Sequence, residues 1–338
     1  MNLITLPEPD KKWDEFVSSH SHLIFHTSLW SKVLKEGYGS KMRYLVMEEK
    51  GEWLSALPGM MVGNRFFKVF YSLIPYGGFI GDRKYLAEFL ILLSQWARKE
   101  KIQRIQIVDL AVKKSEELPD FKCMESNRHV LDLKGKSTDE ILKNYHDALK
   151  RNIKTALKSD LEFERIRTQE EVDQFYHLYL TSMKRKAALI KYPHGLFKKI
   201  YDLLVPEFAD ILFVKHQNQP VAGIVVIYSE DAAHYFHGGS DSRYLSLRPN
   251  DLLFHHAIRI AREKGKSYFD FMGSDKKFLS LMQFKDKWGT RREELFNFHK
   301  DFGFIRPMAF KIALTLVQTS LGSAIHRRWK SIHKEKTI

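Results

Sequence analysis

The strongest constraint on this chain is an ordered run of segments that occurs twice. In the first run, a hairpin turning at Lys50-Gly51 is followed by a third strand, a Gly-containing turn, a helix and a strand. The same order returns later, with the hairpin turning at 217–219. The first strand, the helix and the strand after it recur after 169, 165 and 165 residues. Matching order and spacing favour two copies of one α/β unit over a coincidence of two ordinary α/β stretches.

The segments around the two copies are predicted to be mainly helical. Two helices, "DKKWDEFVSS" and "TSLWSKVLKEG", precede the first copy, and the second of them has a Thr/Ser start and a Gly stop. Between the copies we expect a strand at "VLDL" and one long helix over 137–159, with Ser137 or Thr138 and Glu140 giving a capping-box-like start. A basic helix is predicted over 305–330.

Composition indicates a folded protein in a reducing compartment. The chain is 44% hydrophobic with 24 Phe, which is enough for a sizeable core. Its single cysteine, Cys123, excludes a disulfide framework and a thiol-rich zinc site. The N-terminus lacks a signal-peptide pattern, and no apolar run approaches the length of a membrane span. We expect a cytoplasmic protein, with the inner face of the membrane as a second location open to it.

The net charge of +14 is the main clue to partners. Such an excess favours nucleic acid, phosphorylated substrates or an anionic membrane face, and a surface adapted for solubility has equal weight. The cations concentrate in "KRNIKTALK", "MKRKAALIK" and "HRRWKSIHKEK". The last of these ends the tail helix, which either lies on a membrane or, as we prefer, packs on its own domain.

Most familiar catalytic and metal motifs are missing. The sequence has no H-E-x-x-H, C-x-x-C, G-x-S-x-G, Walker A loop or G-x-G-x-x-G. The neighbours His255 and His256 would point about 100° apart on a helix, so they do not share a site. We therefore expect no metal.

An anion site is predicted instead at the start of the second copy's helix. Unpaired N–H groups at a helix N-terminus favour anions, and Arg248 lies just before Asn250. The alternative is that Asn250 is simply the N-cap of that helix.

Several segments, in order, resemble the Fem-type peptidyltransferases within the GNAT acyltransferase superfamily. "FHTSLWSKVLKEGYG" is similar to the N-terminal helix entry of that family, and "KRNIKTALKSD" to its R-x-x-I-x-K-A-x-K-x-G element. "FYHLYLTSMKRKA" resembles its tyrosine-rich helix, "RPNDLLFHHAIRIAREKGKSYFDFMGS" its P-N-x-L-L helix and D-F strand, and "FKDKWG" its closing F-K-x-x-F/W-G. Together the segments cover most of residues 20–300.

The resemblance implies an α/β (α+β) fold of two tandem GNAT-like domains, each a mixed, largely antiparallel sheet flanked by helices. We place the domains at 1–135 and 136–304, with the active site in the second, and a basic helix at 305–338. The resemblance also implies acyl transfer to an amine without a cofactor, with aminoacyl-tRNA or acyl-CoA as donor and a phosphorylated or lipid-linked acceptor. The family's F-K pair falls on Phe284 and Lys285.

The expected site follows from these motifs and from the chemistry. Lys285 would supply a cation at the acceptor's phosphates or at the developing oxyanion, with Phe284 as its packed anchor. The family arginine is placed on Arg185, with Lys184 and Lys186 as neighbouring alternatives. The remaining candidates are Asp270, as base or, preferably, structural acceptor, and, as substrate-lining residues on one strand face, Tyr235 and His237.

Two departures from the family pattern bear on the donor. The expected glycine after "KTALK" is replaced by Ser159-Asp160, and no charged coiled-coil arm is visible. The acyl-CoA loop [QR]-x-x-G-x-[GA] is also absent, with "RPND" in its place. The leading hypothesis is an aminoacyl- or acyltransferase for an amine of a cell-wall or lipid-linked precursor. The alternatives are an acyl-CoA-dependent N-acetyltransferase acting on a polysaccharide or sugar precursor, and a non-catalytic basic protein that binds RNA or glycolipid.

Overall fold

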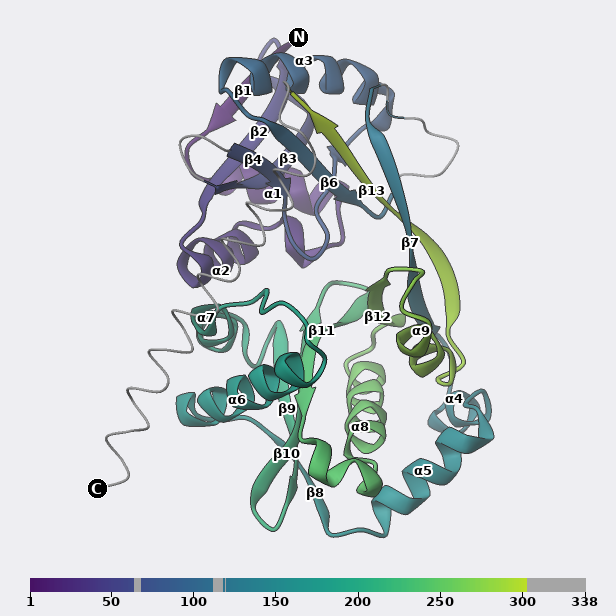
Figure 1. Cartoon of the computed structure of the whole chain (residues 1–338). Helices are drawn as coiled ribbons and strands as arrows, with labels where there is room; N and C mark the ends of the chain where they lie inside the picture. Colours follow the sequence, from purple (N-terminus) through teal and green to yellow (C-terminus); the bar gives the residue numbers. More distant parts are fainter. Residues whose placement is uncertain (64–67, 112–117, 119, 303–338) are drawn as a thin grey trace, which may run out of the picture.

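The computed structural model describes residues 1–63, 68–111, 118 and 120–302. Within them, the predicted repeat is present as two halves of one continuous 13-stranded sheet (Figure 1). In each half a hairpin is followed by a third antiparallel strand, a connection, a helix, and a strand that pairs in parallel with the third. The predicted fold class, a mixed and largely antiparallel sheet flanked by helices, is confirmed.

The first half opens with a strand and two helices before its hairpin. Its helix α3 covers a core of Leu, Ile and Phe side chains from the hairpin and the parallel strand. The elements are β1 (Asn2–Leu6), α1 (Lys11–His20), η1 (Ile24–His26), α2 (Ser28–Tyr38), β2 (Lys41–Glu49), β3 (Glu52–Gly63), β4 (Lys68–Ser72), β5 (Ile80–Gly81), η2 (Arg83–Tyr85), α3 (Leu86–Lys99), β6 (Arg104–Asp109) and β7 (Lys122–Asp132).

The second half repeats this order, with α6 and α7 in the places of α1 and α2, and α8 in the place of α3. Helices α5 and α8 lie over one core on the sheet, and α6 and α7 share a second core with the first half. The elements are α4 (Thr138–Lys143), α5 (Asp147–Leu157), β8 (Leu161–Arg165), α6 (Gln169–Arg185), α7 (His194–Leu204), β9 (Ala209–His216), β10 (Gln219–Tyr228), β11 (Ala232–Ser240), η3 (Ser242–Leu247), α8 (Pro249–Glu263), β12 (Tyr268–Ser274), α9 (Leu279–Asp286) and β13 (Arg291–Asp301).

The halves exchange their last strands. Strand β7, which ends the first half, pairs with β12, whereas β13, which ends the second half, pairs with β6. The two exchanged strands also pair with each other, and Figure 1 shows them crossing together from one half to the other. The sheet therefore runs unbroken across the domain boundary placed between 135 and 136, and that boundary stays a prediction.

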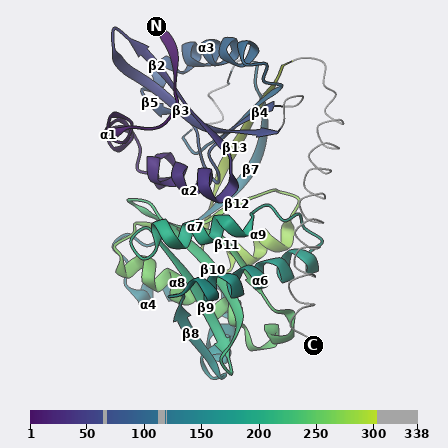
Figure 2. The same ribbon diagram turned by 90° about the vertical axis from the view of Figure 1, so that its left-hand side faces the viewer.

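A close helix contact also joins the halves. Helices α2 and α7 lie against each other between them (Figure 2). A Cβ on Gly37 of α2 would lie 2.6 Å from Leu196 Cα of α7, so only glycine fits there. The helix does not stop at Gly37 as predicted but at Gly39, whose left-handed backbone (φ +68°) ends it.

The long helix predicted over 137–159 is wrong, because the segment forms two helices. Asn144 ends α4, and the His146 N–H donates to the Lys287 carbonyl instead of continuing the helix. The break lets the buried Tyr145 ring pack edge-on against Trp288, with 5.0 Å between centroids. The Ser137 and Glu140 capping box is confirmed.

Two further sequence expectations concern the ends of the chain. Strand β13 was not predicted, and β7 begins eight residues before "VLDL", because both strands depend on pairing with each other. The tail helix predicted over 305–338 lies outside the described residues. Within residues 1–63, 68–111, 118 and 120–302, no helix has the length and apolar character needed to cross a bilayer.

Candidate functional site

The candidate site lies where β11 and β12 part. Their parallel pairing covers three residue pairs and ends at His234 opposite Asp270. Beyond this point β12 has an irregularity between Asp270 and Gly273, with Met272 in a left-handed conformation (φ +67°). The two strands form no further pairs beyond this point, so their outer ends diverge.

Ser240, at the outer end of β11, is bonded to residues of two helices, α6 and α8. Its N–H donates to Ser182 Oγ over 2.7 Å, and its carbonyl accepts from the Arg185 guanidinium over 3.1 Å. The Asn250 amide donates to Ser240 Oγ over 3.2 Å. The structure thus gathers two predicted residues, Arg185 and Asn250, at the rim of the divergence.

Helix α6 can approach this strand because of a glycine. A Cβ on Gly239 would lie 2.4 Å from the Leu178 carbonyl oxygen in α6. The close approach places the exposed end of α6, with its run Lys184, Arg185 and Lys186, beside the end of β11.

The start of α8 differs from the predicted Asn cap. The helix begins at Pro249, and the N-cap is Arg248, in a left-handed conformation (φ +64°) with an exposed side chain. Pro249 has no N–H, and the Asp251 and Leu252 N–H groups donate to the Arg248 carbonyl. Of the first four helical residues, Asn250 is therefore the one whose N–H is left for a ligand.

Asp270 is fully buried and holds the inner end of the divergence. Its carboxylate accepts from His234 Nδ1 over 3.2 Å, from Arg128 over 3.4 Å and from the Met272 N–H over 2.7 Å. Burial alone would raise the pKa of this carboxyl, but the His234 hydrogen bond and the Arg128 charge hold it below its usual value. The geometry favours the structural acceptor over the base, and a catalytic role stays a prediction.

Lys285 is also buried, with 2% of the residue exposed. Its ammonium donates to the Met272 carbonyl over 2.8 Å and to the Gly273 carbonyl over 3.4 Å. Burial lowers the pKa of Lys285 to about 8, and the Asp270 charge opposes the shift. The ammonium therefore lies on β12 within the divergence, and its contact with a substrate phosphate stays a prediction.

The three aromatic candidates lie on different sides of the sheet. Tyr235 and Phe284 both contact Phe254, at centroid distances of 4.7 and 5.4 Å, in the core beneath α8. His237 lies instead among the rings of Tyr179 and Tyr192, on the side of α6. The prediction that Tyr235 and His237 share a strand face is wrong, because a register shift opposite Val225 and Val226 leaves one extra residue in β11 and breaks the alternation.

His237 is held neutral by its surroundings. Burial lowers its pKa to about 4, and the charges of Lys186 and Lys191 act in the same direction. Its Nδ1 accepts the Gly238 N–H over 2.8 Å. The ring therefore lines the α6 side of the strand end as an uncharged group.

Sequence reasoning missed a buried anchor beside the site. Asp251 accepts from Asn152 of α5 over 2.9 Å and from the Lys287 ammonium over 2.5 Å. These residues lie inside the three motifs "KRNIK", "RPND" and "FKDKWG", but nothing in their spacing showed that the motifs meet. The anchor fixes the start of α8 relative to the helix that carries Lys285.

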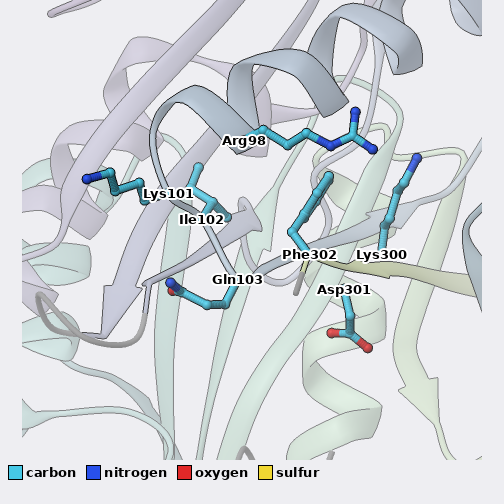
Figure 3. A pocket seen from close by; sticks show the side chains of 7 residues that line it. All are labelled: Arg98, Lys101, Ile102, Gln103, Lys300, Asp301 and Phe302. Atoms are coloured by element: carbon cyan, nitrogen blue, oxygen red, sulfur yellow. The ribbon is translucent and has the colours of Figure 1, made fainter. Parts of the chain in front are cut away.

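A metal-ligand cluster or a surface cavity would be an alternative site. Within the described ranges, no group of three or more His, Cys, Asp or Glu residues is arranged to hold a metal ion. A surface cavity of about 380 Å³ lies in the first half, at the end of α3 (Figure 3). It is lined by Arg98, Lys101, Ile102, Gln103, Lys300, Asp301 and Phe302, none of which was a candidate.

In sequence, the family model that matches this chain lies in the second half. Residues 143–286 match the family model described as an acetyltransferase (GNAT) domain. Over 90 residues the chain is 29% identical to a lipid II:glycine glycyltransferase from Staphylococcus haemolyticus. That match spans 25% of this chain and 22% of the relative, so the matched region is about a fifth of the relative's length.

Solved structures resemble the whole chain. FemX matches with a TM-score of 0.67 and 17% identity, covering 87% of this chain and 96% of FemX. L-PGS from Bacillus licheniformis matches with a TM-score of 0.59 and 13% identity, covering 92% of this chain and 98% of L-PGS. A tandem GNAT protein from the clavulanic acid biosynthesis pathway matches with a TM-score of 0.59 and 9% identity, covering 90% of this chain and 99% of that protein. At these identities the likeness shows a shared fold, that of tandem GNAT domains.

The matched GNAT domain contains β11 and β12, and so the point where they diverge. The match to the glycyltransferase is in sequence, and the match to FemX is in the fold of both halves. Residues 143–286 thus match a GNAT acetyltransferase domain, and the chain is similar to a lipid II:glycine glycyltransferase over part of its sequence and to FemX in its fold.

Proposed function

We propose that this protein is an acyltransferase that moves an aminoacyl or acyl group onto an amine of a cell-wall or lipid-linked precursor. The carrying observation is the divergence of β11 and β12 with the cations at its rim. Arg185 and Arg248 are both exposed there, and Asn250 presents the N-terminal N–H of α8. A cationic rim next to the parted strands, with the Lys285 ammonium on the carbonyls of β12, suits a substrate that carries both a phosphate and a reacting carbonyl.

The second half is the reactive one in this proposal. In the first half, the corresponding parting of β4 and β6 is filled by the chain itself, because Gly77 forms a bridge with Asp109. In the second half, the connection after β11 turns away, since the Asp241 N–H donates to the Val221 carbonyl of β10. The family model matches this same half.

The start of α8 supports aminoacyl-tRNA over acyl-CoA as the donor. A diphosphate bound at a helix N-terminus needs several free N–H groups. Here proline removes one, and the Arg248 carbonyl takes those of Asp251 and Leu252. The Asp251 carboxylate, although paired with Lys287, adds a negative charge to the same turn.

The chemistry requires no covalent intermediate on the protein. The acceptor amine attacks the carbonyl of the activated ester, the carbon–oxygen ester bond breaks, and the amine proton leaves with the departing alcohol or to water. The protein's part is to hold the two substrates in line and to place positive charge where the oxyanion develops. In this proposal Lys285 supplies that charge.

The function is tested with two labelled donors. Purified protein is incubated with a lipid-linked diphosphate muropeptide and either glycyl-tRNA or acetyl-CoA, each labelled in the acyl group. Label passing from the tRNA to the lipid fraction supports the proposal. No transfer from either donor, while a known Fem-type enzyme is active in the same assay, contradicts it.

A second candidate is the acyl-CoA-dependent N-acetyltransferase. The observation in its favour is the matched family model, whose description names an acetyltransferase. Calorimetric titration with acetyl-CoA at low salt separates the two. Saturable binding of one molecule per chain favours this alternative, and no binding agrees with the reduced N–H set of α8.

A further inference from the structure

A buried line of polar groups runs from the first half to the point where β11 and β12 part. The Ile24 N–H of the first half donates to Ser229 Oγ over 3.1 Å. Ser229 Oγ lies 2.9 Å from His234 Nε2, and His234 Nδ1 lies 3.2 Å from Asp270 Oδ2. Since this last pair closes the β11–β12 pairing, the line ends at the inner end of the divergence.

The line continues along β12 to α9. The second oxygen of Asp270 accepts the Met272 N–H over 2.7 Å, which holds that residue in its left-handed conformation. In this conformation the Met272 and Gly273 carbonyls both accept from the Lys285 ammonium. Asp270 is thus the group that connects His234 to the placement of Lys285.

The contacts assign the protons. The Asp270 carboxylate can only accept, so His234 Nδ1 carries the ring proton that is donated to it. In the neutral ring Nε2 is then the acceptor, and the Ser229 hydroxyl donates to it while Ser229 Oγ accepts from the Ile24 N–H. The Ser-His-Asp order is that of a hydrolase triad, but Ser229 is only 5% exposed and His234 and Asp270 are fully buried. No substrate reaches this serine, so the line positions groups and does not itself react.

The first half packs directly on the line. The Phe25 ring lies 5.0 Å from the His234 ring, and the Tyr76 ring lies 6.1 Å from it. Burial, and the Asp270 carboxylate after it, raise the pKa of Tyr76 well above its usual value. Side chains of the first half therefore enclose this line of polar groups. Its geometry depends on how the first half packs against the second.

We propose that His234 is a positioning residue, which links the seating of the first half to the placement of the Lys285 ammonium at the divergence. The consequence for catalysis rests on the proposed function. The consequence for Lys285 itself does not, because a change in its exposure is measurable without any substrate.

Two substitutions at His234 separate positioning from simple packing. In His234→Asn the side-chain amide takes the place of Nδ1 and keeps the bond to Asp270. In His234→Gln it takes the place of Nε2 and keeps only the bond to Ser229. The amine reactivity of Lys285 is measured in the full chain by pulse acetylation with acetic anhydride and peptide mass spectrometry, relative to Lys287 on the same helix. His256, which stacks on Phe163 away from the line, takes the same two substitutions as the control pair.

We expect the Lys285 to Lys287 labelling ratio to stay within about twofold of the original in His234→Asn and to rise about five- to tenfold in His234→Gln, since loosening β12 exposes a buried amine. Both control variants should leave the ratio unchanged. Equal ratios in His234→Asn and His234→Gln would overturn the proposal, as would a rise in the His256 pair.

The transfer activity of His234→Asn and His234→Gln provides a second test. If the proposed transfer is observed, kcat should fall in His234→Gln with KM unchanged and be retained in His234→Asn. If no transfer is observed with the unsubstituted protein, the proposed function fails, and the labelling ratio alone decides the role of His234.

Discussion

The two halves share one topology but differ at the point where their parallel strands diverge. In the first half, the Asp109 carboxylate accepts from the Phe79 and Ala111 N–H groups, over 3.0 and 2.7 Å, and holds the chain across the gap between β4 and β6. In the second half, the ammonium of Lys285 lies on one strand edge and the connection leads away to β10. A duplicated fold thus has one strand divergence that its own connection bridges and one whose connection pairs with β10 instead.

The difference shows what makes a site out of a common scaffold. Parallel strands that part expose hydrogen-bonding edges, and these must be satisfied by backbone, side chain or ligand. In the first half, residues of the connection between the strands satisfy these edges. We therefore expect the first half to have a structural role. The second half satisfies only part of them, with a buried cation, and this is where substrate binding is expected.

The largest effect is expected from removing the charge of Lys285. We expect Lys285→Met to lower kcat/KM for the proposed transfer about 100- to 1,000-fold, as for other groups that stabilise a developing oxyanion. The thermal unfolding profile checks that the variant is folded. Lys277→Met, at an exposed cation just before the same helix, is the control and should retain most activity. Unchanged turnover in Lys285→Met would remove this residue from the site.

Removing the Asp109 carboxylate, which holds the connection of the first half, should lower the stability of the fold without changing its activity. Asp109→Ala leaves the Phe79 and Ala111 N–H groups without their acceptor, so the free energy of unfolding should fall by about 2–3 kcal/mol. Urea unfolding measures the loss, and Asp82→Ala, at an exposed carboxylate, should change it little. Activity per folded molecule should be unchanged. A loss of activity with stability retained would mean that the first half takes part in the reaction.

The buried His237 should make the second half sensitive to acid. Its pKa is about 4 in the folded protein, against an ordinary value of 6.5, so the unfolded chain binds more protons between these values. Stability contributed by the neutral ring is therefore complete above pH 6.5 and is lost as the pH falls towards 4.

This loss is measured against His237→Phe, which keeps an aromatic ring but does not titrate. Between neutral pH and the lower end of this range, the original protein should lose on the order of 2 kcal/mol more than the variant. Other buried histidines titrate equally in both proteins and cancel in the difference. Parallel stability curves would show that His237 is not the group responsible.

The smallest effect distinguishes neighbours on α6. Arg185 reaches the Ser240 carbonyl, and Lys184 is the adjacent exposed cation. We expect Arg185→Ala to raise KM for the phosphate-bearing substrate about five- to tenfold, with kcat little changed, and Lys184→Ala to have less than half this effect. Equal effects of the two variants would point to general attraction by the positive surface instead of a specific contact.

The sequence predicted the repeat and, within each copy, the order of hairpin, third strand, helix and final strand, because these are encoded in local patterns. Hairpin turns, apolar alternation and helix periodicity recur at a fixed spacing, so they are visible without knowledge of contacts. The motif around 248–250 likewise located the start of α8, whereas helix α9 was not predicted. The exchange of β7 and β13 was not visible, since a strand's partner is not encoded in its own alternation.

What the sequence by itself determined is therefore the tandem plan of the fold and the repeated order of its elements. Tertiary structure decided the rest: the break at Tyr145 that fits its ring to Trp288, the extra residue in β11 that separates Tyr235 from His237, and the burial of Lys285 on β12. Each of these depends on a contact between segments far apart in the chain. A local pattern fixes which residues can be buried or bonded, but the partner that satisfies them is set only when the two halves pack together.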